Sequence, residues 1–233
     1  MAVEEAIVLV GGLGTRLRQV VPDLPKPLAP VAGRPFLAWL LDALAGARMR
    51  RVILATGHMA EAVESVVGSG WGDMEVVYSR EHAPLGTGGA VRLAARHVGG
   101  DGVHLLNGDT WLRYDPAGLE AATRRAGCAL GIALAAVDDV ARYGAVEVSD
   151  GKVAGFREKG GTGAGLINAG SYFLTGAALR GLPDVQAFSF EERVLAPMAM
   201  RGEVAAFADT AGFIDIGVPE DYARAQSMFA EAR

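Results

Sequence analysis

Short apolar runs alternate with segments of helical periodicity along the first 110 residues of the chain. The apolar runs, which are typical of buried strands, lie at 6–10, 52–56, 75–78 and 103–106. The segments between them that carry apolar residues at helical spacing are 35–47, 58–67 and 88–97. Successive strands joined through helices pair in parallel, and the helices then cover both faces of the sheet. We therefore expect an α/β fold with a Rossmann-like, mostly parallel mixed sheet, flanked by helices in a single α/β/α domain.

The pattern changes after residue 110. Strand-like segments now follow one another with few helices between them, at 129–137, 144–148, 152–157 and 167–174. Asp150-Gly151 is a strong signal for a tight turn, so residues 144–157 should form a hairpin. Helices are expected at 119–126, 188–200 and 219–232. Because no linker or repeat interrupts the chain, we predict one domain over 1–233, with a first half (1–110) and a second half (111–233) that share one sheet.

The composition bounds the function classes. Hydrophobic residues make up 51% of the 233 residues and charged residues 21%, as in a globular protein. The net charge is −5, whereas nucleic-acid-binding proteins usually carry a basic stripe, so nucleic acid is not an expected partner. No apolar run reaches membrane-spanning length, and the N-terminus lacks the features of a signal peptide. We therefore expect a cytoplasmic protein without a membrane partner, and Cys128, the only cysteine, is read as a core residue.

A glycine-rich loop follows the first predicted strand. Gly11, Gly12 and Gly14 allow backbone N–H groups to point at a ligand, and such a nest binds anions. Arg16 adds a charged fork suited to phosphate oxygens, and Lys26 adds a point charge between two prolines. Glycines alone fit a tight strand-to-helix turn equally well, and the spacing is neither that of a Walker loop nor that of a dinucleotide site.

Two aspartates are candidates for a metal site. Asp109 follows a buried strand and a glycine, which places it at the carboxyl end of the sheet, where open α/β sheets bind ligands. A carboxylate there can hold Mg²⁺, a hard cation that also takes substrate phosphates; a helix cap or a turn is the alternative. Asp215 lies in an apolar run and needs a partner, either a metal or a nearby arginine.

Seven ordered motifs give the chain a specific resemblance. The segment Gly11 to Pro35 reads Gly-Gly-Leu-Gly-Thr-Arg-Leu and then Pro-Lys-Pro-Leu-Ala-Pro-Val-Ala-Gly-Arg-Pro. The later motifs are Pro84-Leu-Gly-Thr-Gly-Gly89, Leu106-Asn-Gly-Asp109, Arg142-Tyr-Gly144, Phe156-Arg-Glu-Lys159, Ile167-Asn-Ala-Gly170 and Phe213-Ile-Asp-Ile-Gly217. Together they resemble the sugar-1-phosphate nucleotidylyltransferases over nearly the whole chain. This resemblance implies the nucleotide-diphospho-sugar transferase type of fold, with a nucleotide-binding half over 1–110 and a sugar-binding half over 111–233.

The resemblance also implies roles for individual residues. Asp109 and Asp215 would share Mg²⁺, and the catalytic set would be Arg16, Lys26, Asp109 and Lys159. The nucleotide would contact Leu9, Gly11, Gly12, Gly14, Thr15, Glu81, Gly86, Thr87 and Gly88. The sugar phosphate would contact Asn107, Tyr143, Gly144, Glu158, Lys159 and Asn168. On residue type alone, Glu158 and Lys159 also fit an exposed ion pair.

Glu81 is the candidate for reading the base. One carboxylate can accept both N1–H and N2–H of guanine, whereas uracil offers it only N3–H, so guanine is modestly favoured. Within the family, the motifs resemble those of D-glycero-α-D-manno-heptose 1-phosphate guanylyltransferases, which supply surface polysaccharide synthesis. Mannose-1-phosphate guanylyltransferases and uridylyltransferases are near neighbours.

The expected reaction is attack by the sugar phosphate on the α-phosphorus of GTP, with pyrophosphate leaving. A phosphate dianion needs no general base, which fits a sequence without an obvious catalytic histidine. The alternatives from other classes are an inactive nucleotide-sugar-binding regulatory module and a glycosyltransferase. The latter usually carries an Asp-x-Asp motif, whereas Thr110 and Trp111 follow Asp109. A homo-oligomer is a further possibility that the sequence leaves open.

Overall fold

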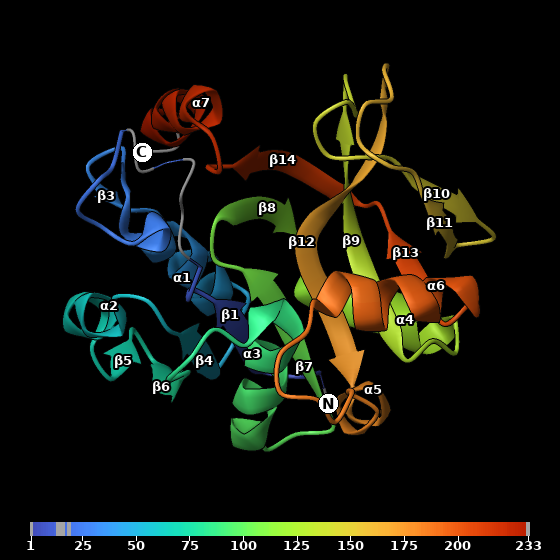
Figure 1. Ribbon diagram of the computed structural model, residues 1–233, viewed down its shortest axis with the longest axis horizontal. Coiled ribbons are helices and arrows are strands. Elements are labelled where there is room, and N and C mark those ends of the chain that lie inside the picture. The colour runs from blue at the N-terminus through green and yellow to red at the C-terminus, as the bar shows by residue number, and fades with distance from the viewer. Residues whose placement is uncertain (1, 13–16, 18–19, 232–233) are drawn as a thin grey trace.

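The computed structural model describes residues 2–12, 17 and 20–231 (Figure 1). Its main sheet extends through both halves of the chain. In the described residues it has ten strands, in the order β10 (Val146–Ser149), β11 (Lys152–Phe156), β13 (Val204–Phe207), β9 (Leu130–Val137), β12 (Gly165–Thr175), β7 (Gly102–Asn107), β1 (Glu5–Leu9), β4 (Arg51–Thr56), β6 (Met74–Arg80) and β5 (Gly70–Trp71).

Most strands of this sheet run in one direction. β6, β4, β1 and β7 pair in parallel, as expected for strands joined through helices. β12 is antiparallel to both of its neighbours, β7 and β9, and β11 and β5 also run against the majority. The predicted α/β class, with a mostly parallel mixed sheet flanked by helices, is confirmed. The predicted hairpin is also present, and its turn uses positive φ at Asp150 (51°) and Gly151 (73°).

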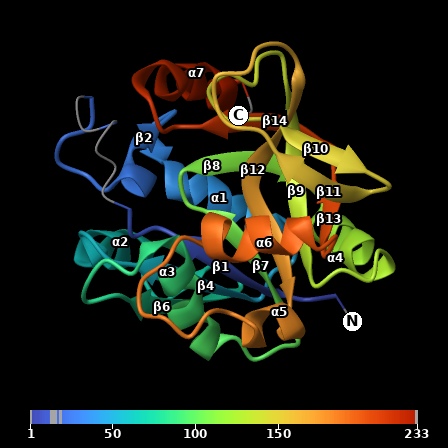
Figure 2. The same ribbon diagram turned by 45° about the vertical axis from the view of Figure 1, so that its right-hand side comes forward.

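Helices cover both faces of the sheet (Figures 1 and 2). α1 (Phe36–Gly46), α2 (Ala60–Val67), α4 (Pro116–Arg125) and α7 (Pro219–Ala230) pack on one face, and α3 (Gly86–Ala94), α5 (Gly176–Arg180) and α6 (Ala196–Met200) on the other. The alternation along β1 shows why: Ala6 and Val8 face α1, whereas Ile7 faces α3, since successive side chains of a strand point to opposite faces. A π-helix, η4 (Glu191–Leu195), leads directly into α6.

A second, two-stranded sheet was not predicted. β8 (Thr110–Tyr114) pairs antiparallel with β14 (Thr210–Asp215), and the register sets Asp215 opposite Thr110. The smaller elements are β2 (Pro30–Val31), β3 (Arg34–Pro35), η2 (Lys26–Leu28) and η3 (Ala95–His97). None of the helices in the described ranges has both the length and the apolar character that a bilayer crossing requires.

Candidate active site

The candidate site lies at the carboxyl ends of the parallel strands. β1 ends at Leu9 and leads to Gly11 and Gly12, β4 leads to Gly57, β6 leads to Glu81, and β7 leads to Asp109. Parallel strands end at one edge of a sheet, so residues from four distant parts of the sequence meet there. Gly108 is held at this edge by its N–H, which donates to the Leu9 carbonyl at 2.8 Å.

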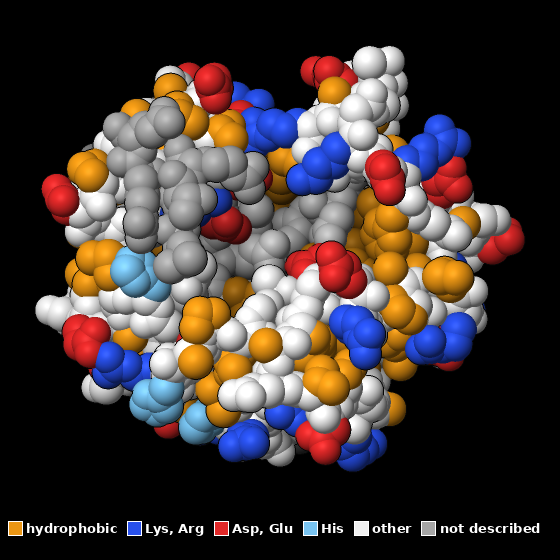
Figure 3. Space-filling model, viewed as in Figure 1, with side chains coloured by type: hydrophobic (Ala, Val, Ile, Leu, Met, Phe, Trp, Pro, Cys, Tyr) orange, Lys and Arg blue, Asp and Glu red, His pale blue; other side chains and the backbone are white. Residues whose placement is uncertain are grey.

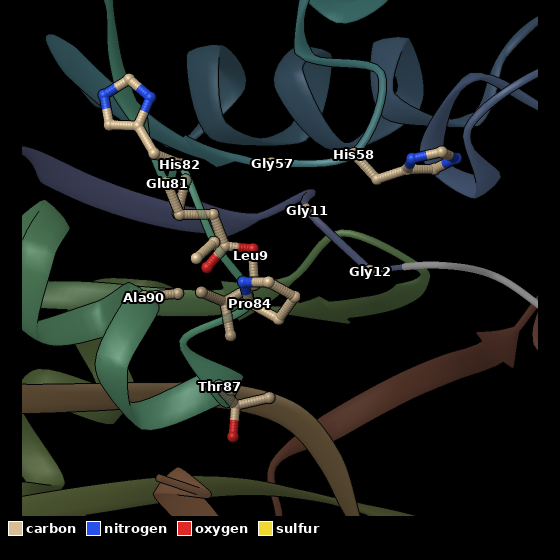
Figure 4. Close-up of a pocket in the computed structure, with 13 residues that line it drawn as sticks. Leu9, Gly11, Gly12, Gly57, His58, Glu81, His82, Pro84, Thr87 and Ala90 are labelled. Atoms are coloured by element: carbon tan, nitrogen blue, oxygen red, sulfur yellow. The ribbon is translucent and has the colours of Figure 1, made fainter. Parts of the chain in front are cut away.

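A cavity of about 470 Å³ opens at this edge (Figure 4). Its size is within the usual range for a small-molecule site. Six of the nucleotide-binding residues predicted from the sequence line it: Leu9, Gly11, Gly12, Glu81, Gly86 and Thr87. Gly57 and His58, which the sequence analysis did not assign, line it as well.

Glu81 projects into this cavity (Figure 4). One of its oxygens, Oε2, accepts a hydrogen bond from the Leu85 N–H at 3.2 Å. The carboxylate lies against the backbone of Gly11 and Gly57, and a Cβ on Gly57 would overlap with it. Burial raises the pKa of the Glu81 carboxyl, and the bond from Leu85 opposes that rise. A partly desolvated carboxylate of this kind gains from any ligand that brings N–H donors.

Residues 85–89 comprise Leu85 and the first turn of α3, and this segment, which we call the base loop, packs tightly against a segment of the second half. Gly86 has a φ of +69°, and a Cβ there would lie 2.6 Å from the Phe188 carbonyl oxygen. Gly88 faces the Phe188 ring, which leaves no room for a Cβ, and its N–H donates to the Phe188 carbonyl at 2.9 Å. Both glycines were predicted to contact the nucleotide. Gly86 lines the cavity, whereas Gly88 faces Phe188 and is not among the described residues that line it.

Asp109, Asp215 and Lys26 form a compact charged cluster. Lys26 Nζ lies 2.5 Å from Asp109 Oδ2 and 3.7 Å from Asp215 Oδ1. The β8–β14 pairing explains how a residue about 100 positions away reaches Asp109, because Asp215 is the partner of Thr110. A backbone bond from the Ile216 N–H to the Asp109 carbonyl, at 3.0 Å, fixes the same junction. Asp109 and Asp215, which the family resemblance paired, therefore lie close together in the structure.

Asp215 is the more buried of the two carboxylates. Burial, and next the negative charge of Asp109, raise the pKa of Asp215, while Lys26, the Gly217 N–H and Arg142 oppose the rise. Arg142 Nη2 lies 3.6 Å from Asp215 Oδ2. Arg142 also pairs with Asp221 of α7, which is 6% exposed. The sequence analysis placed Arg142 in the motif Arg142-Tyr-Gly144 but predicted no function for its side chain.

The carboxylate pair fits a hard cation. Two neighbouring carboxylates, one with a raised pKa, have an excess of negative charge that a lysine ammonium only partly neutralises. Mg²⁺ is typically held by one or two carboxylates, with water and substrate phosphates completing the shell. The described residues contain no group of three or more His, Cys, Asp or Glu side chains that could hold a metal. Water and substrate oxygens would supply the remaining ligands.

The predicted sugar-phosphate residues divide between two loops and the strands β7 and β12. Gly144 has a φ of +81° and packs on the Arg157 carbonyl, so the loop at 140–144 lies against the loop that carries Glu158 and Lys159, two exposed residues. The Tyr143 hydroxyl donates to Asp221 Oδ2 at 3.3 Å, and burial with this carboxylate raises its pKa to about 12.

Asn107 and Asn168 both lie beside Gly170, at the bulge of β12. Asn168 Oδ1 accepts the Gly170 N–H at 2.9 Å, and its amide donates to the Tyr172 hydroxyl at 2.8 Å. Gly170 has a φ of +70°, and a Cβ there would lie 2.7 Å from the Asn107 amide nitrogen. Gly170 therefore contacts both asparagines. Three predicted residues, Gly14, Thr15 and Arg16, lie outside the described residues.

Comparisons with known proteins identify the family of the chain. The family model described as nucleotidyl transferase matches residues 5–232. The D-glycero-alpha-D-manno-heptose 1-phosphate guanylyltransferase of Aneurinibacillus thermoaerophilus is 39% identical over 95% of this chain and 96% of its own length. The mannose-1-phosphate guanylyltransferase of Mycobacterium tuberculosis is 33% identical, over 94% of this chain but 63% of its own length.

A solved structure of a related protein has the same fold. The crystal structure of HddC from Yersinia pseudotuberculosis complexed with GMP-PN superposes with a TM-score of 0.86. The two sequences are 35% identical, and the match covers 98% of this chain and all of the other. The family, predicted from the motifs, and the fold, predicted from the alternation of strands and helices, are confirmed. The chain belongs to the nucleotidyl transferase family.

Proposed function

We propose that the protein transfers GMP from GTP to D-glycero-α-D-manno-heptose 1-phosphate and releases pyrophosphate. The observation that carries this proposal is the 39% identity, over nearly the full length of both chains, with a guanylyltransferase of that name. A second heptose 1-phosphate guanylyltransferase, from Campylobacter jejuni, is 36% identical over 94% of this chain. The product, a GDP-heptose, would be a donor for surface polysaccharide such as a capsule, and a cytoplasmic location remains part of the proposal.

The triphosphate would lie along the edge where β1, β4 and β6 end. In this arrangement Glu81 accepts N–H groups of guanine inside the cavity. Lys26 reaches the phosphates from η2, and Arg16 is assigned to them from its motif alone. Uracil, with one N–H on this edge, would make one of the two bonds to Glu81, which is why we propose GTP over UTP.

In the transfer step an oxygen of the sugar phosphate forms a bond to the α-phosphorus, and the bond from that phosphorus to the bridging oxygen of pyrophosphate breaks. Lys26, with Arg16, would stabilise the charge on the departing pyrophosphate. Lys159 would hold the phosphate of the sugar, and Glu158 and Asn168 its hydroxyl groups. Mg²⁺, held by Asp109 and Asp215, would neutralise phosphate charge when bound.

A pyrophosphate-release assay tests the proposal. The full chain is incubated with Mg²⁺ and each of four nucleoside triphosphates, crossed with a panel of sugar 1-phosphates that includes the heptose and mannose. We expect release with GTP and the heptose 1-phosphate. Release with mannose 1-phosphate alone would favour the second candidate, which the Mycobacterium relative supports. Failure of every pair would contradict the enzyme assignment and favour a nucleotide-sugar-binding regulatory module.

A further inference from the structure

The base loop is bound to one segment of the second half, residues 186–191. The Phe188 N–H donates to the Leu85 carbonyl at 2.9 Å, and the Gly88 N–H donates back to the Phe188 carbonyl at 2.9 Å. These bonds join parts of the chain about 100 residues apart. Leu85 also donates its N–H to Glu81, so one residue connects this segment with the carboxylate in the cavity.

Side chains reinforce the same junction. The Thr87 hydroxyl donates to Glu191 Oε2 at 2.8 Å and accepts the Phe190 N–H at 2.8 Å. The Ser189 hydroxyl donates to the same Glu191 oxygen at 3.1 Å. Figure 4 shows the Thr87 hydroxyl turned away from Glu81 and Pro84. Thr87 therefore lines the cavity with its methyl side and uses its hydroxyl to hold the loop.

The residues next to Glu191 are well packed. It opens η4, a π-helix, and such single-turn π segments are rare and occur often at functional sites. The neighbouring Phe190 is fully buried and packs edge-on against Tyr172, with ring centroids 5.3 Å apart. The Tyr172 hydroxyl in turn accepts the Asn168 amide. The junction thus connects the base loop with the strand that carries Asn168.

We propose that Glu191 is a positioning residue for the nucleotide base: through Thr87 it fixes the base loop, and hence Leu85 and Glu81, in the geometry that receives the base. The inference rests on the proposed function in taking the cavity as the guanine site. Glu191 is not among the residues that line the cavity. It acts through Thr87, and its loss should change how well the nucleotide binds more than how fast the bound nucleotide reacts.

The test measures the dissociation constant of a non-hydrolysable GTP analogue by calorimetry, together with kcat and KM for GTP. E191A and T87V should each weaken binding about 10-fold, as expected for a lost hydrogen bond to a charged group, while kcat stays within about 2-fold. The double variant should lose clearly less than the 100-fold product of two independent changes, because both changes break the Thr87–Glu191 contact, although T87V also removes the acceptor of the Phe190 N–H. E191Q and T87S, which keep an acceptor and a hydroxyl, should recover most of the affinity.

E192A is the matched control, because Glu192 is the next residue in the chain, carries the same charge and is exposed. Equal binding by E191A and E192A would overturn the inference, and so would losses that multiply to about 100-fold in the double variant. Loss in kcat at unchanged KM would overturn it as well. If E191A does not fold, the inference is tested by T87V and T87S alone, and equal affinity of these two variants for the GTP analogue would overturn it. Failure of the proposed function would instead appear in the wild type, as absence of pyrophosphate release.

Discussion

At the scale of single residues, Glu81 is the side chain whose replacement should report on the base. Glu81→Gln keeps the size of the side chain but replaces one acceptor oxygen by a donor, which would oppose the N–H groups of guanine. We expect kcat/KM for GTP to fall at least about 10-fold, with a smaller fall for UTP, which presents one N–H. Steady-state kinetics with both nucleotides measure this. The control is Glu75→Gln, at a side chain that is 62% exposed, and an equal fall for both nucleotides would contradict base reading by Glu81.

The carboxylate of Asp109 is the second residue-scale test. Asp109→Asn removes one charge of the pair that would hold Mg²⁺ and leaves Lys26 beside Asp215. Pyrophosphate release should drop at least about 100-fold, the usual cost of losing a charge-stabilising group. The thermal midpoint should change little, since the Asp109 side chain is 36% exposed. The comparison is Asp101→Asn, whose side chain is 79% exposed. Near-normal turnover by Asp109→Asn would remove Asp109 from the mechanism.

Elements of secondary structure were predicted well where a local pattern carries them. Strands such as β1 and β4 are short apolar runs, and α1 and α7 have apolar residues at helical spacing, so each is visible in its own stretch of sequence. β8 and β14 were missed because their pairing partner is about 100 residues away and neither has a continuous apolar run. This pairing brings Asp215 to Asp109, so half of the acidic pair could be assigned only from the family resemblance.

The helix expected over 188–200 was also only partly correct. It is a π-helix over Glu191–Leu195 followed by α6. Pro197 has no N–H with which to complete the helical bond to the residue four positions before it, and the wider turn precedes this proline. A periodicity of 3.6 residues does not distinguish the two kinds of helix. The role of Glu191 was therefore not visible in the sequence, where Ser189-Phe-Glu-Glu192 looks like an ordinary helix start.

α7 should be sensitive to one buried carboxylate. Asp221 pairs with Arg142 and, at 3.3 Å, with Arg224. Breaking a buried ion pair costs about 3–5 kcal/mol, but these arginine side chains are 37% and 58% exposed, so we expect Asp221→Asn to lower the free energy of unfolding by about 1–2 kcal/mol. Urea unfolding measures this against Glu220→Gln, a change at an exposed residue of the same helix. Indistinguishable midpoints would show that Asp221 does not anchor α7.

At the scale of the whole molecule, each substrate region is built from both halves of the chain. Segment 186–191 of the second half holds the base loop of the first, and β14 brings Asp215 to the end of β7. On the face that Figure 3 shows, the Lys and Arg side chains of the described residues lie beside Asp and Glu side chains and form no continuous stripe among themselves. The division into a nucleotide-binding half and a sugar-binding half stays a prediction. It describes where the two ligands would lie, whereas the residues that hold each region in place come from both halves.

The stability of the whole molecule should depend on pH through His104. This residue of β7 is fully buried against Phe173, with ring centroids 5.1 Å apart, and neither ring nitrogen has a hydrogen-bond partner in the described part of the chain. Burial lowers the pKa of His104 from 6.5 to about 4, although the charges of Glu120 and Asp115 oppose the shift. Since the folded pKa lies below the unfolded one, the unfolded chain binds the proton more readily. The stability conferred by neutral His104 is thus complete above pH 6.5 and is lost as the pH falls towards 4.

The variant His104→Leu isolates this contribution, because Glu81 and Asp215, whose raised pKa values act in the opposite direction, are present in both proteins. Between pH 7 and pH 5 the wild type should lose about 2 kcal/mol more unfolding free energy than the variant. Urea unfolding at both pH values measures the difference. The leucine itself changes the unfolding free energy by the same amount at both pH values. This change therefore cancels when the pH dependence of the two proteins is compared. Parallel pH dependence in the two proteins would mean that His104 finds a proton-accepting partner, such as a buried water, which would hold its pKa near that of the unfolded chain.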